Sequence, residues 1–173
     1  MIRRASASVA LHDSLRERIL NLDLAPGQYI SRSEIAAEYQ VSLTPVRDAL
    51  IKLEEEGLIH IYPQSKTEVS KIDLAHAQET HILRLSLELE VVRRLAAMGG
   101  SAPIQAARSS LAQQIAAHDA NDLSSFVRLD RTFHKALYEA IGVEALSSVI
   151  EARSGHIDRL RKLNLPAPGK SES

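Results

Sequence analysis

The segment from Ser42 to Gly57, SLTPVRDALIKLEEEG, constrains the fold most, because it specifies both ends of a short helix. Thr44 is a good N-cap, and Pro45 suits the first helical position, where an N–H would have no partner anyway. Gly57 is a plausible C-cap. The inward stripe is Val46, Ala49, Leu50 and Leu53, and the outward residues are Leu43, Thr44, Arg47, Asp48, Ile51 and Lys52. The outward residues lie near the positive end of a rigid helix, which suits phosphates and base edges.

Two more helices precede this one and a hairpin follows it. Apolar residues recur at Leu11, Leu15, Ile19 and Leu22, which predicts an amphipathic helix over 9–22. Pro26 and Gly27 end that helix, and a second helix is expected at 32–39. Residues 58–70 then predict two short strands around a turn at 63–66. The expected order is helix, helix, helix, hairpin.

From Ile72 onward the pattern is entirely helical. A helix of about 25 residues carries two apolar stripes, so we expect it to be covered on two sides. Its stripes are Ile82, Leu85, Leu89, Val92 and Ala96, and Leu83, Leu87, Val91 and Leu95. Three further helices are expected, one carrying Ile104, Leu111 and Ile115, one over 126–141, and one over 146–163. The fold class is therefore mainly α, with an all-α helical bundle as its second part.

Composition and charge limit the possible functions. The chain has neither a charged leader with an apolar core nor an apolar run of ~18 residues, so no signal peptide or membrane span is expected and the default compartment is the cytoplasm. The absence of cysteine excludes disulfides and thiolate metal sites. Residues 1–70 hold eight Lys or Arg and ten Asp or Glu, a balance of 8 − 10 = −2, so any attraction to nucleic acid depends on a local basic patch.

Residues 15–59 carry the motifs L.PG, VS.TPVR.AL and L..EGL in that order. With these motifs the chain resembles the GntR family of bacterial transcription regulators, in its FCD (FadR-related) branch, over nearly its whole length. The resemblance implies a winged helix-turn-helix DNA-binding domain over 1–70. It also implies an all-helical FCD-like effector-binding and dimerisation domain over 71–173, which we expect to be incomplete at its C-terminus.

The resemblance also implies how DNA would be contacted, with the third helix in the major groove and the wing on the adjacent backbone or minor groove. Thr44 and Arg47 match contacts of the recognition helix. Leu43 stands where the family usually has arginine, and Ser65 and Lys66 replace its Arg-Gly wing tip. The expected basic face comprises Arg3, Arg4, Arg32, Arg47, Lys52 and Lys66. The alternative is that Arg47 and Lys52 are ordinary solvated charges.

A candidate metal site lies in the segment FVRLDRTFHKAL, residues 126–137. Asp130 falls near the middle of the apolar face and His134 at its edge, so both could reach one divalent ion such as zinc, nickel or manganese. The pair resembles the aspartate and first histidine of metal-binding FCD regulators, whose two other histidines lie on helices beyond the part matched here. An Asp–His hydrogen bond or a salt bridge to a buried arginine is the alternative.

Arginines on apolar faces suggest an effector site. Arg153 lies among apolar residues of the last predicted helix and needs an anion, either Asp130 or the carboxylate of a small ligand. Arg84 forms a polar strip with Glu88 and His81, although an i, i+4 salt bridge also explains it. His156 is a possible substitute ligand, or a surface residue. Relatives in the FCD branch commonly sense organic acids or sugar acids.

Together these features predict a DNA-binding transcription regulator that binds operator DNA as a homodimer, has no membrane partner and responds to a small carboxylate. Repression relieved by the ligand is the commoner family behaviour, and activation stays open. The chain is not expected to be an enzyme. The alternatives are a truncated regulator that only dimerises, and a metal-dependent hydrolase or lyase that uses Asp130 and His134.

Overall fold

The computed structural model describes residues 2–63 and 66–164, and only the backbone of 2–6 and 101. Within it the chain forms two compact units, one with the residues up to 79 and those from 152 onward, the other with 80–151. This grouping reflects packing and does not test the predicted division into 1–70 and 71–173, which stays a prediction. None of the described helices combines the length and apolarity that crossing a membrane needs.

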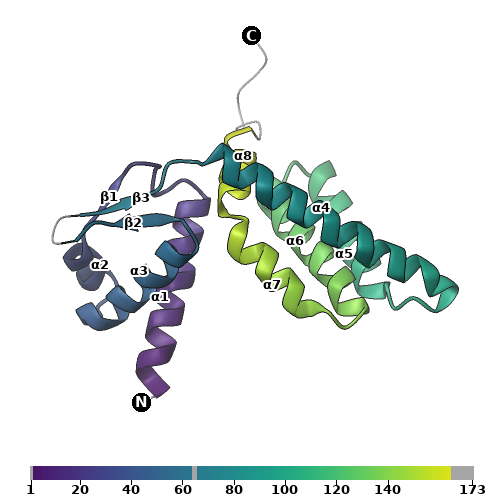
Figure 1. The fold of residues 1–173 in the computed structure, drawn as a ribbon, viewed down its shortest axis with the longest axis horizontal. Helices are drawn as coiled ribbons and strands as arrows, with labels where there is room; N and C mark the ends of the chain where they lie inside the picture. Colours follow the sequence, from purple (N-terminus) through teal and green to yellow (C-terminus); the bar gives the residue numbers. More distant parts are fainter. Residues whose placement is uncertain (1, 64–65, 165–173) are drawn as a thin grey trace, which may run out of the picture. The chain divides into compact units, whose positions relative to one another are not determined.

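The first unit contains the three predicted helices and the predicted hairpin (Figure 1). Its elements are α1 (Ile2–Leu20), β1 (Tyr29–Ile30), α2 (Arg32–Glu38), α3 (Leu43–Glu55), β2 (Ile59–Ile61) and β3 (Thr67–Val69). The antiparallel sheet has the order β1-β3-β2, with Tyr29 opposite Glu68 and His60 also opposite Glu68. Strand β1 was not predicted, because two residues are too short to show an alternating pattern.

The core of the first unit joins the helices to the hairpin. Its buried apolar residues include Leu11, Leu15, Ile19, Val46, Ala49, Leu50, Leu53, Leu58, Ile59 and Val69. The predicted apolar stripe of α1 included Leu22, which lies beyond the end of the helix. The helix ends at Leu20, Leu22 has a φ of 67°, and Leu24 is the buried residue beyond the turn. Gly27 and Gly57 have φ values of 84° and 71°, which glycine adopts readily. The C-cap of α3 is Glu56 and not the predicted Gly57, which follows it.

The predicted start of α3 is wrong by two residues. Ser42 occupies the N-cap position without a side-chain hydrogen bond, and the helix begins at Leu43. Thr44 is therefore inside the first turn and does not cap the helix. Pro45 is the third helical residue, where its missing N–H still leaves no helical hydrogen bond unmade. The predicted division of α3 into a buried and an outward face is confirmed.

The last predicted helix, 146–163, is two helices in the structure, α7 (Glu144–Arg153) and α8 (Gly155–Asn164). Helix α8 belongs to the first unit, where it packs against α1. Gly155 is buried, and a Cβ at this position would overlap the Leu58 side chain. The break beside Gly155 therefore allows α8 to lie close to the hairpin and to bury His156 and Arg159.

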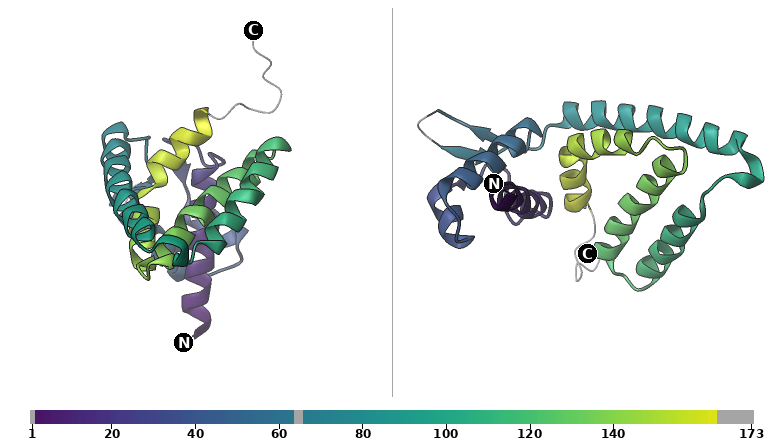
Figure 2. Two further views of the ribbon diagram at one scale, coloured as in Figure 1. Left: turned by 90° about the vertical axis from the view of Figure 1, so that its right-hand side faces the viewer. Right: turned by 90° about the horizontal axis from the view of Figure 1, so that it is seen from below.

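The second unit is helical throughout. It contains most of α4 (Leu74–Ala97), then η1 (Gly99–Ser101), α5 (Gln105–Asp119), α6 (Leu123–Ala140) and the first part of α7. Helices α5 and α6 pack along each other (Figure 2). A small cluster around Val91, Leu95 and Tyr138 joins α4 to α6.

Two predicted apolar faces of the second unit are exposed. The α4 residues Ile82, Leu85, Leu89 and Val92 are 49–63% exposed, so within the described residues α4 is covered on one side and not on two. On α5, Leu111 and Ile115 are exposed, and the buried residues are Ala107, Ser110, Gln114 and Ala117. The small residues face inward on α5 because α6 packs closely along it.

Candidate nucleic-acid interface and ligand site

The outward face of α3 is the first candidate site. Thr44, Arg47 and Lys52 are all exposed, as predicted. Two apolar side chains share this face, Leu43 at 58% exposed and Ile51 at 37%. Side chains four residues apart lie on one side of a helix, so Leu43, Arg47 and Ile51 form a row.

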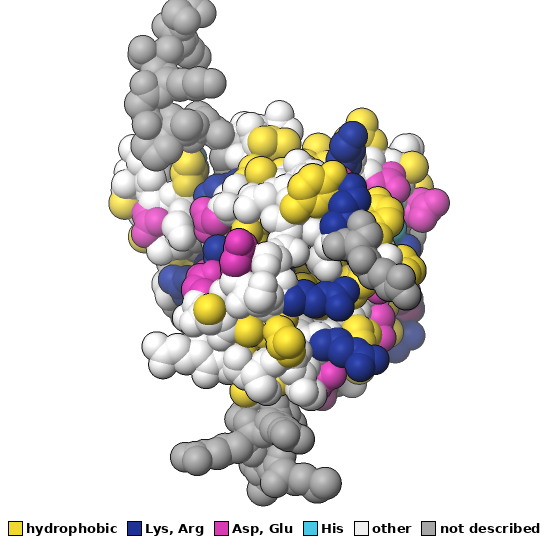
Figure 3. Space-filling model, turned by 90° about the vertical axis from the view of Figure 1, so that its left-hand side faces the viewer, with side chains coloured by type: hydrophobic (Ala, Val, Ile, Leu, Met, Phe, Trp, Pro, Cys, Tyr) yellow, Lys and Arg dark blue, Asp and Glu magenta, His cyan; other side chains and the backbone are white. Residues whose placement is uncertain are grey.

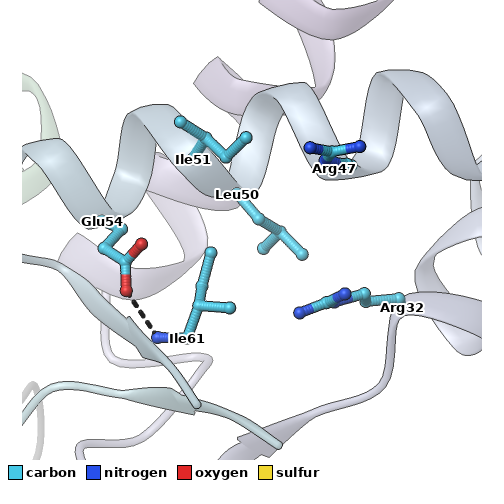
Figure 4. A pocket seen from close by; sticks show the side chains of 6 residues that line it. All are labelled: Arg32, Arg47, Leu50, Ile51, Glu54 and Ile61. Atoms are coloured by element: carbon cyan, nitrogen blue, oxygen red, sulfur yellow. Dashed lines mark hydrogen bonds between the residues drawn. The ribbon is translucent and has the colours of Figure 1, made fainter. Parts of the chain in front are cut away.

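A hollow of about 260 Å³ lies beside this row, between α3, the start of α2 and β2 (Figure 4). It is lined by Arg32, Arg47, Leu50, Ile51, Glu54 and Ile61. Glu54 turns away from the arginines, because its Oε1 accepts a hydrogen bond from the Ile61 N–H at 2.7 Å. Within the described part of the chain, neither Arg32 nor Arg47 forms an ion pair, so both guanidinium groups can meet an external anion.

A half-buried polar cluster lies at the C-terminal end of α3. Glu56 accepts from Arg16 Nε at 2.7 Å, and its other oxygen lies 2.6 Å from His12 Nε2. Both partners are on α1, so the Glu56 carboxylate is paired within the first unit. This arrangement ties the C-terminal end of α3 to α1, while Arg47 and Lys52 stay exposed on the outward face.

The wing carries an arrangement of side chains that the sequence did not suggest. Lys66 Nζ donates to Tyr29 Oη at 2.6 Å, lies 3.1 Å from Glu68 Oε2, and stands 4.9 Å from the Tyr62 ring centroid. The Tyr29 hydrogen bond and the Glu68 carboxylate raise the pKa of Lys66. Tyr29 and Tyr62 are 61% and 42% exposed. The predicted wing cation is therefore held between two tyrosines, one of them on the unpredicted strand β1.

Exposed Lys and Arg side chains gather on one side of the first unit. Figure 3 shows a row of Lys and Arg side chains there, with apolar side chains between them. Arg32, Arg47 and Lys52 are among the exposed residues, and Lys66 is half-buried. The side chains of Arg3 and Arg4, and Ser65 at the predicted wing tip, lie outside the described residues.

The second candidate site brings together Arg84, Glu88, Asp130 and His134 in the helical unit. Arg84 Nε donates to Glu88 Oε1 at 2.7 Å, and its Nη2 lies 4.0 Å from Asp130 Oδ2. His134 lies between two carboxylates, with Nδ1 2.9 Å from Glu88 Oε1 and Nε2 3.7 Å from Asp130 Oδ1. The four charges form one network that joins α4 to α6.

Interactions within this network shift the pKa values of two of its members, His134 and Glu88. Burial lowers the pKa of His134, but the carboxylates of Asp130 and Glu88 outweigh burial and raise it. Burial opposes ionisation of Glu88, but His134 and Arg84 together lower its pKa. Both shifts favour the charged forms of His134 and Glu88 over their neutral forms.

Polar groups beside the network have hydrogen-bonding capacity. Gln114 Nε2 donates to Asp130 Oδ1 at 3.2 Å. The Tyr138 hydroxyl is buried and has no hydrogen-bond partner among the described residues. A buried hydroxyl without a partner is unfavourable, so this position would gain from a polar ligand atom. Neither residue was singled out from the sequence, because each becomes relevant only through helix packing.

The predicted metal ligands fit a metal only in part. Asp130 and His134 supply oxygen and nitrogen donors of the right kind for zinc, nickel or manganese. However, within residues 2–63 and 66–164 no group of three or more His, Asp or Glu side chains is arranged to hold a metal ion. The contacts of Asp130 with His134 and Arg84 match the alternative, an ion-pair network.

The predicted position of Arg153 is wrong. Its side chain is 44% exposed, with Nη2 4.0 Å from Glu79 Oε2, and it does not lie on a buried face. The break before Gly155 ends the predicted helix at this point, so the apolar stripe does not continue past it. The buried arginine is Arg159, which is fully inaccessible.

His156 has a structural environment in the first unit. Its Nδ1 accepts from the Asp73 N–H at 2.9 Å and from Arg159 Nη2 at 3.0 Å. Burial and the charge of Arg159 lower the pKa of His156 to about 4. The ring is therefore neutral at pH 7 and its Nδ1 is occupied, so these contacts give no support to its predicted ligand role.

Comparison with known proteins identifies two parts of the chain. Residues 7–69 match the model of bacterial regulatory proteins of the gntR family, and residues 79–173 match that of the FCD domain. A regulator in an unstable DNA locus of Streptomyces ambofaciens is 37% identical over 87% of this chain and 63% of its own length. The transcriptional repressor RspR of Escherichia coli K12 is 34% identical over 87% of this chain and 66% of its own length. The chain thus spans less than two thirds of each relative.

Solved structures agree with this fold. Escherichia coli McbR/YncC superposes with a TM-score of 0.73 at 20% identity, over 92% of this chain and 76% of that one. A GntR regulator from Rhodococcus sp. RHA1 gives 0.75 at 19% identity, over 94% and 77%. The motifs, the fold and the matched models agree, and the chain belongs to the gntR family of bacterial regulatory proteins, in the branch that carries an FCD domain.

Proposed function

We propose that the protein is a DNA-binding transcription regulator of the cytoplasm, with residues 1–70 as the DNA-binding domain and 71–173 as the effector-binding and dimerisation domain. The observation that carries this proposal is the hollow beside the outward face of α3, which is bordered by Arg47 of α3 and Arg32 of α2, neither with an ion pair among the described residues. Their free guanidinium groups suit phosphates and guanine edges. Thr44, Lys52 and Lys66 complete the proposed contact surface.

Binding to a palindromic operator requires two copies of α3, so we infer a homodimer. The exposed α4 residues Ile82, Leu85, Leu89 and Val92 support pairing through the helical domain, because a row of large apolar side chains is usually covered by a partner. Repression is the proposed direction of control, since the relative RspR is named a repressor.

The proposed effector is a small organic acid bound in the helical domain. Arg84 and His134 are the cationic groups for its carboxylate, and the unpartnered Tyr138 hydroxyl offers a further hydrogen bond. In the alternative arrangement, neutral His134 and Asp130 would hold a divalent ion, which would bind the same carboxylate as a Lewis acid in place of the protonated imidazole. Arg153 and His156 stay predictions for this role, without support from their contacts.

Control of DNA binding would follow from linkage. An effector that prefers one arrangement of the helical domains changes the spacing of the two α3 helices, and thereby the affinity for the operator. The change in operator affinity per bound effector cannot exceed the ratio of the effector's affinities for the two arrangements.

The main test uses duplex DNA selected from a random pool by the purified protein. Arg47→Ala should weaken binding of the selected operator by about 1–3 kcal/mol, because a guanidinium contact to a base edge or phosphate is lost. Arg108→Ala, an exposed arginine on α5, is the matched control and should bind as the wild type does. Equal binding by all three proteins in a gel-shift titration would refute the proposal, and mixed dimerisation without any DNA binding would favour the dimerisation-only alternative.

The metal is tested separately. Metal analysis of protein saturated with zinc, nickel or manganese and then dialysed should find bound metal in the wild type and none in Asp130→Ala. Operator binding should be intact in the variant, because Asp130 is remote in function from α3. A wild-type protein without bound metal would contradict the metal proposal. The carboxylate proposal would then be tested by titrating the protein with organic acids.

A further inference from the structure

We propose that Leu43 is a specificity-determining residue that packs against the 5-methyl group of a thymine in the operator. The proposal rests on the proposed DNA-binding role of α3 and adds to it one base and one chemical group. It predicts that part of the sequence preference comes from an apolar contact beside the polar contacts of Arg47.

The exposure of Leu43 is the first argument. Leu43 is the first residue of α3 and is 58% exposed, whereas Val46, Leu50 and Leu53, the apolar residues further along α3, are fully buried. Pro45, two positions on, is buried and fixes the backbone of the first turn. Leu43 is thus a rigidly placed apolar group with most of its surface in water.

The neighbours of Leu43 are the second argument. Arg47 and Ile51 follow it at intervals of four residues on the same outward face, and Ile51 is 37% exposed. Helical side chains lean toward the N-terminus, so Leu43 projects past the end of α3. In the motif the N-terminal part of the recognition helix contacts the base edges, and this is where Leu43 lies.

The chemistry of the groove selects the partner. Leucine has no hydrogen-bond donor or acceptor, so it gains nothing from the polar edges of guanine, adenine or cytosine. Thymine alone among the four bases presents a methyl group in the major groove. Contact between Leu43 and this methyl removes apolar surface of both partners from water, and the other three bases offer no methyl group for this contact.

The test removes the methyl group from either partner. Each thymine of the selected operator is replaced in turn by deoxyuridine, which keeps the Watson–Crick pair and the O4 acceptor and lacks only the methyl. At one thymine in each half-site, wild-type protein should lose affinity by about 3- to 10-fold, as expected for one buried methyl contact. Leu43→Ala should bind the thymine and deoxyuridine duplexes at that position within about twofold of each other.

Two variants serve as controls. Leu43→Met keeps a large apolar side chain and should retain the sensitivity to deoxyuridine. Val9→Ala shortens a comparably exposed apolar residue on α1, at 45% exposed, and should behave as the wild type. A 5-methylcytosine placed at the identified position should bind wild type better than cytosine does, and this difference should vanish in Leu43→Ala.

The possible failures are distinguishable. If Arg47→Ala weakens binding but deoxyuridine affects wild type and Leu43→Ala equally at every position, the inference about Leu43 is wrong and the proposed function stands. If the wild type binds no duplex in preference to another and Arg47→Ala changes nothing, both are overturned.

Discussion

Arg159→Ala should lower the free energy of unfolding of this protein by about 3 kcal/mol, although Arg159 lies outside both candidate sites. The side chain is fully buried and donates four hydrogen bonds within the first unit. Its acceptors are the Ser70 carbonyl at 2.6 Å, His156 Nδ1 at 3.0 Å, the Gly155 carbonyl at 3.2 Å and Ser70 Oγ at 3.4 Å. The guanidinium thus ties α8 to the end of β3.

The magnitude follows from opposing contributions. Truncation leaves the Ser70 carbonyl without this donor and removes one of two donors to His156, at about 1–3 kcal/mol for each buried group left unpaired. The cavity left by the side chain adds to this loss. Truncation also removes an unfavourable contribution, the free energy of burying the charged guanidinium. Burial lowers the pKa of Arg159 to about 10, which reflects this cost. The net loss should be about 2–4 kcal/mol.

The assay is urea unfolding of the whole chain at pH 7, followed by far-ultraviolet circular dichroism. Arg161→Ala, an exposed neighbour on α8, is the control and should change the unfolding free energy by no more than about 0.5 kcal/mol. Arg159→Met keeps the apolar stem and removes the charge, so it should lose less than Arg159→Ala. If Arg159→Ala and Arg161→Ala were equally stable, the reasoning that these buried hydrogen bonds exceed the cost of desolvation would be refuted.

Three further predictions concern buried polar groups. The pKa of His156 is about 4 in the folded protein and higher in the unfolded chain, so the unfolded chain binds the extra proton first and the free energy of unfolding should fall by about 3 kcal/mol as the pH drops from 6.5 to 4. Urea titrations of His156→Gln should show a smaller change over this pH range, and an unchanged pH dependence would contradict the prediction. Glu56→Ala should destabilise by about 2 kcal/mol, because Arg16 and His12 lose their shared carboxylate, and thermal unfolding close to wild type would argue otherwise. Tyr138→Phe should stabilise by up to about 1 kcal/mol in the absence of effector, since it removes an unpaired buried hydroxyl, and a clear loss of stability would indicate a hidden partner.

The sequence by itself determined the elements that local periodicity and turn chemistry specify. The two faces of α3, the hairpin around its turn, the length of α4 and the i, i+4 pair Asp130–His134 all follow from spacing along one element. Such patterns are visible in sequence because a helix or strand places residues on one face at a fixed interval. The motifs in the first 60 residues were specific enough to indicate the family.

Only the tertiary structure determined which side chains are buried and which elements pack against them. The break at Gly155 makes Arg159 the buried arginine in place of Arg153, and no local pattern separates two arginines of one helical stretch. In the same way α4 buries one of its two apolar stripes, and Glu88 meets His134 only because α4 lies against α6. Whether a residue is buried depends on what packs against it. The packing residues are far apart in the chain, so their contact produces no periodic pattern in the sequence.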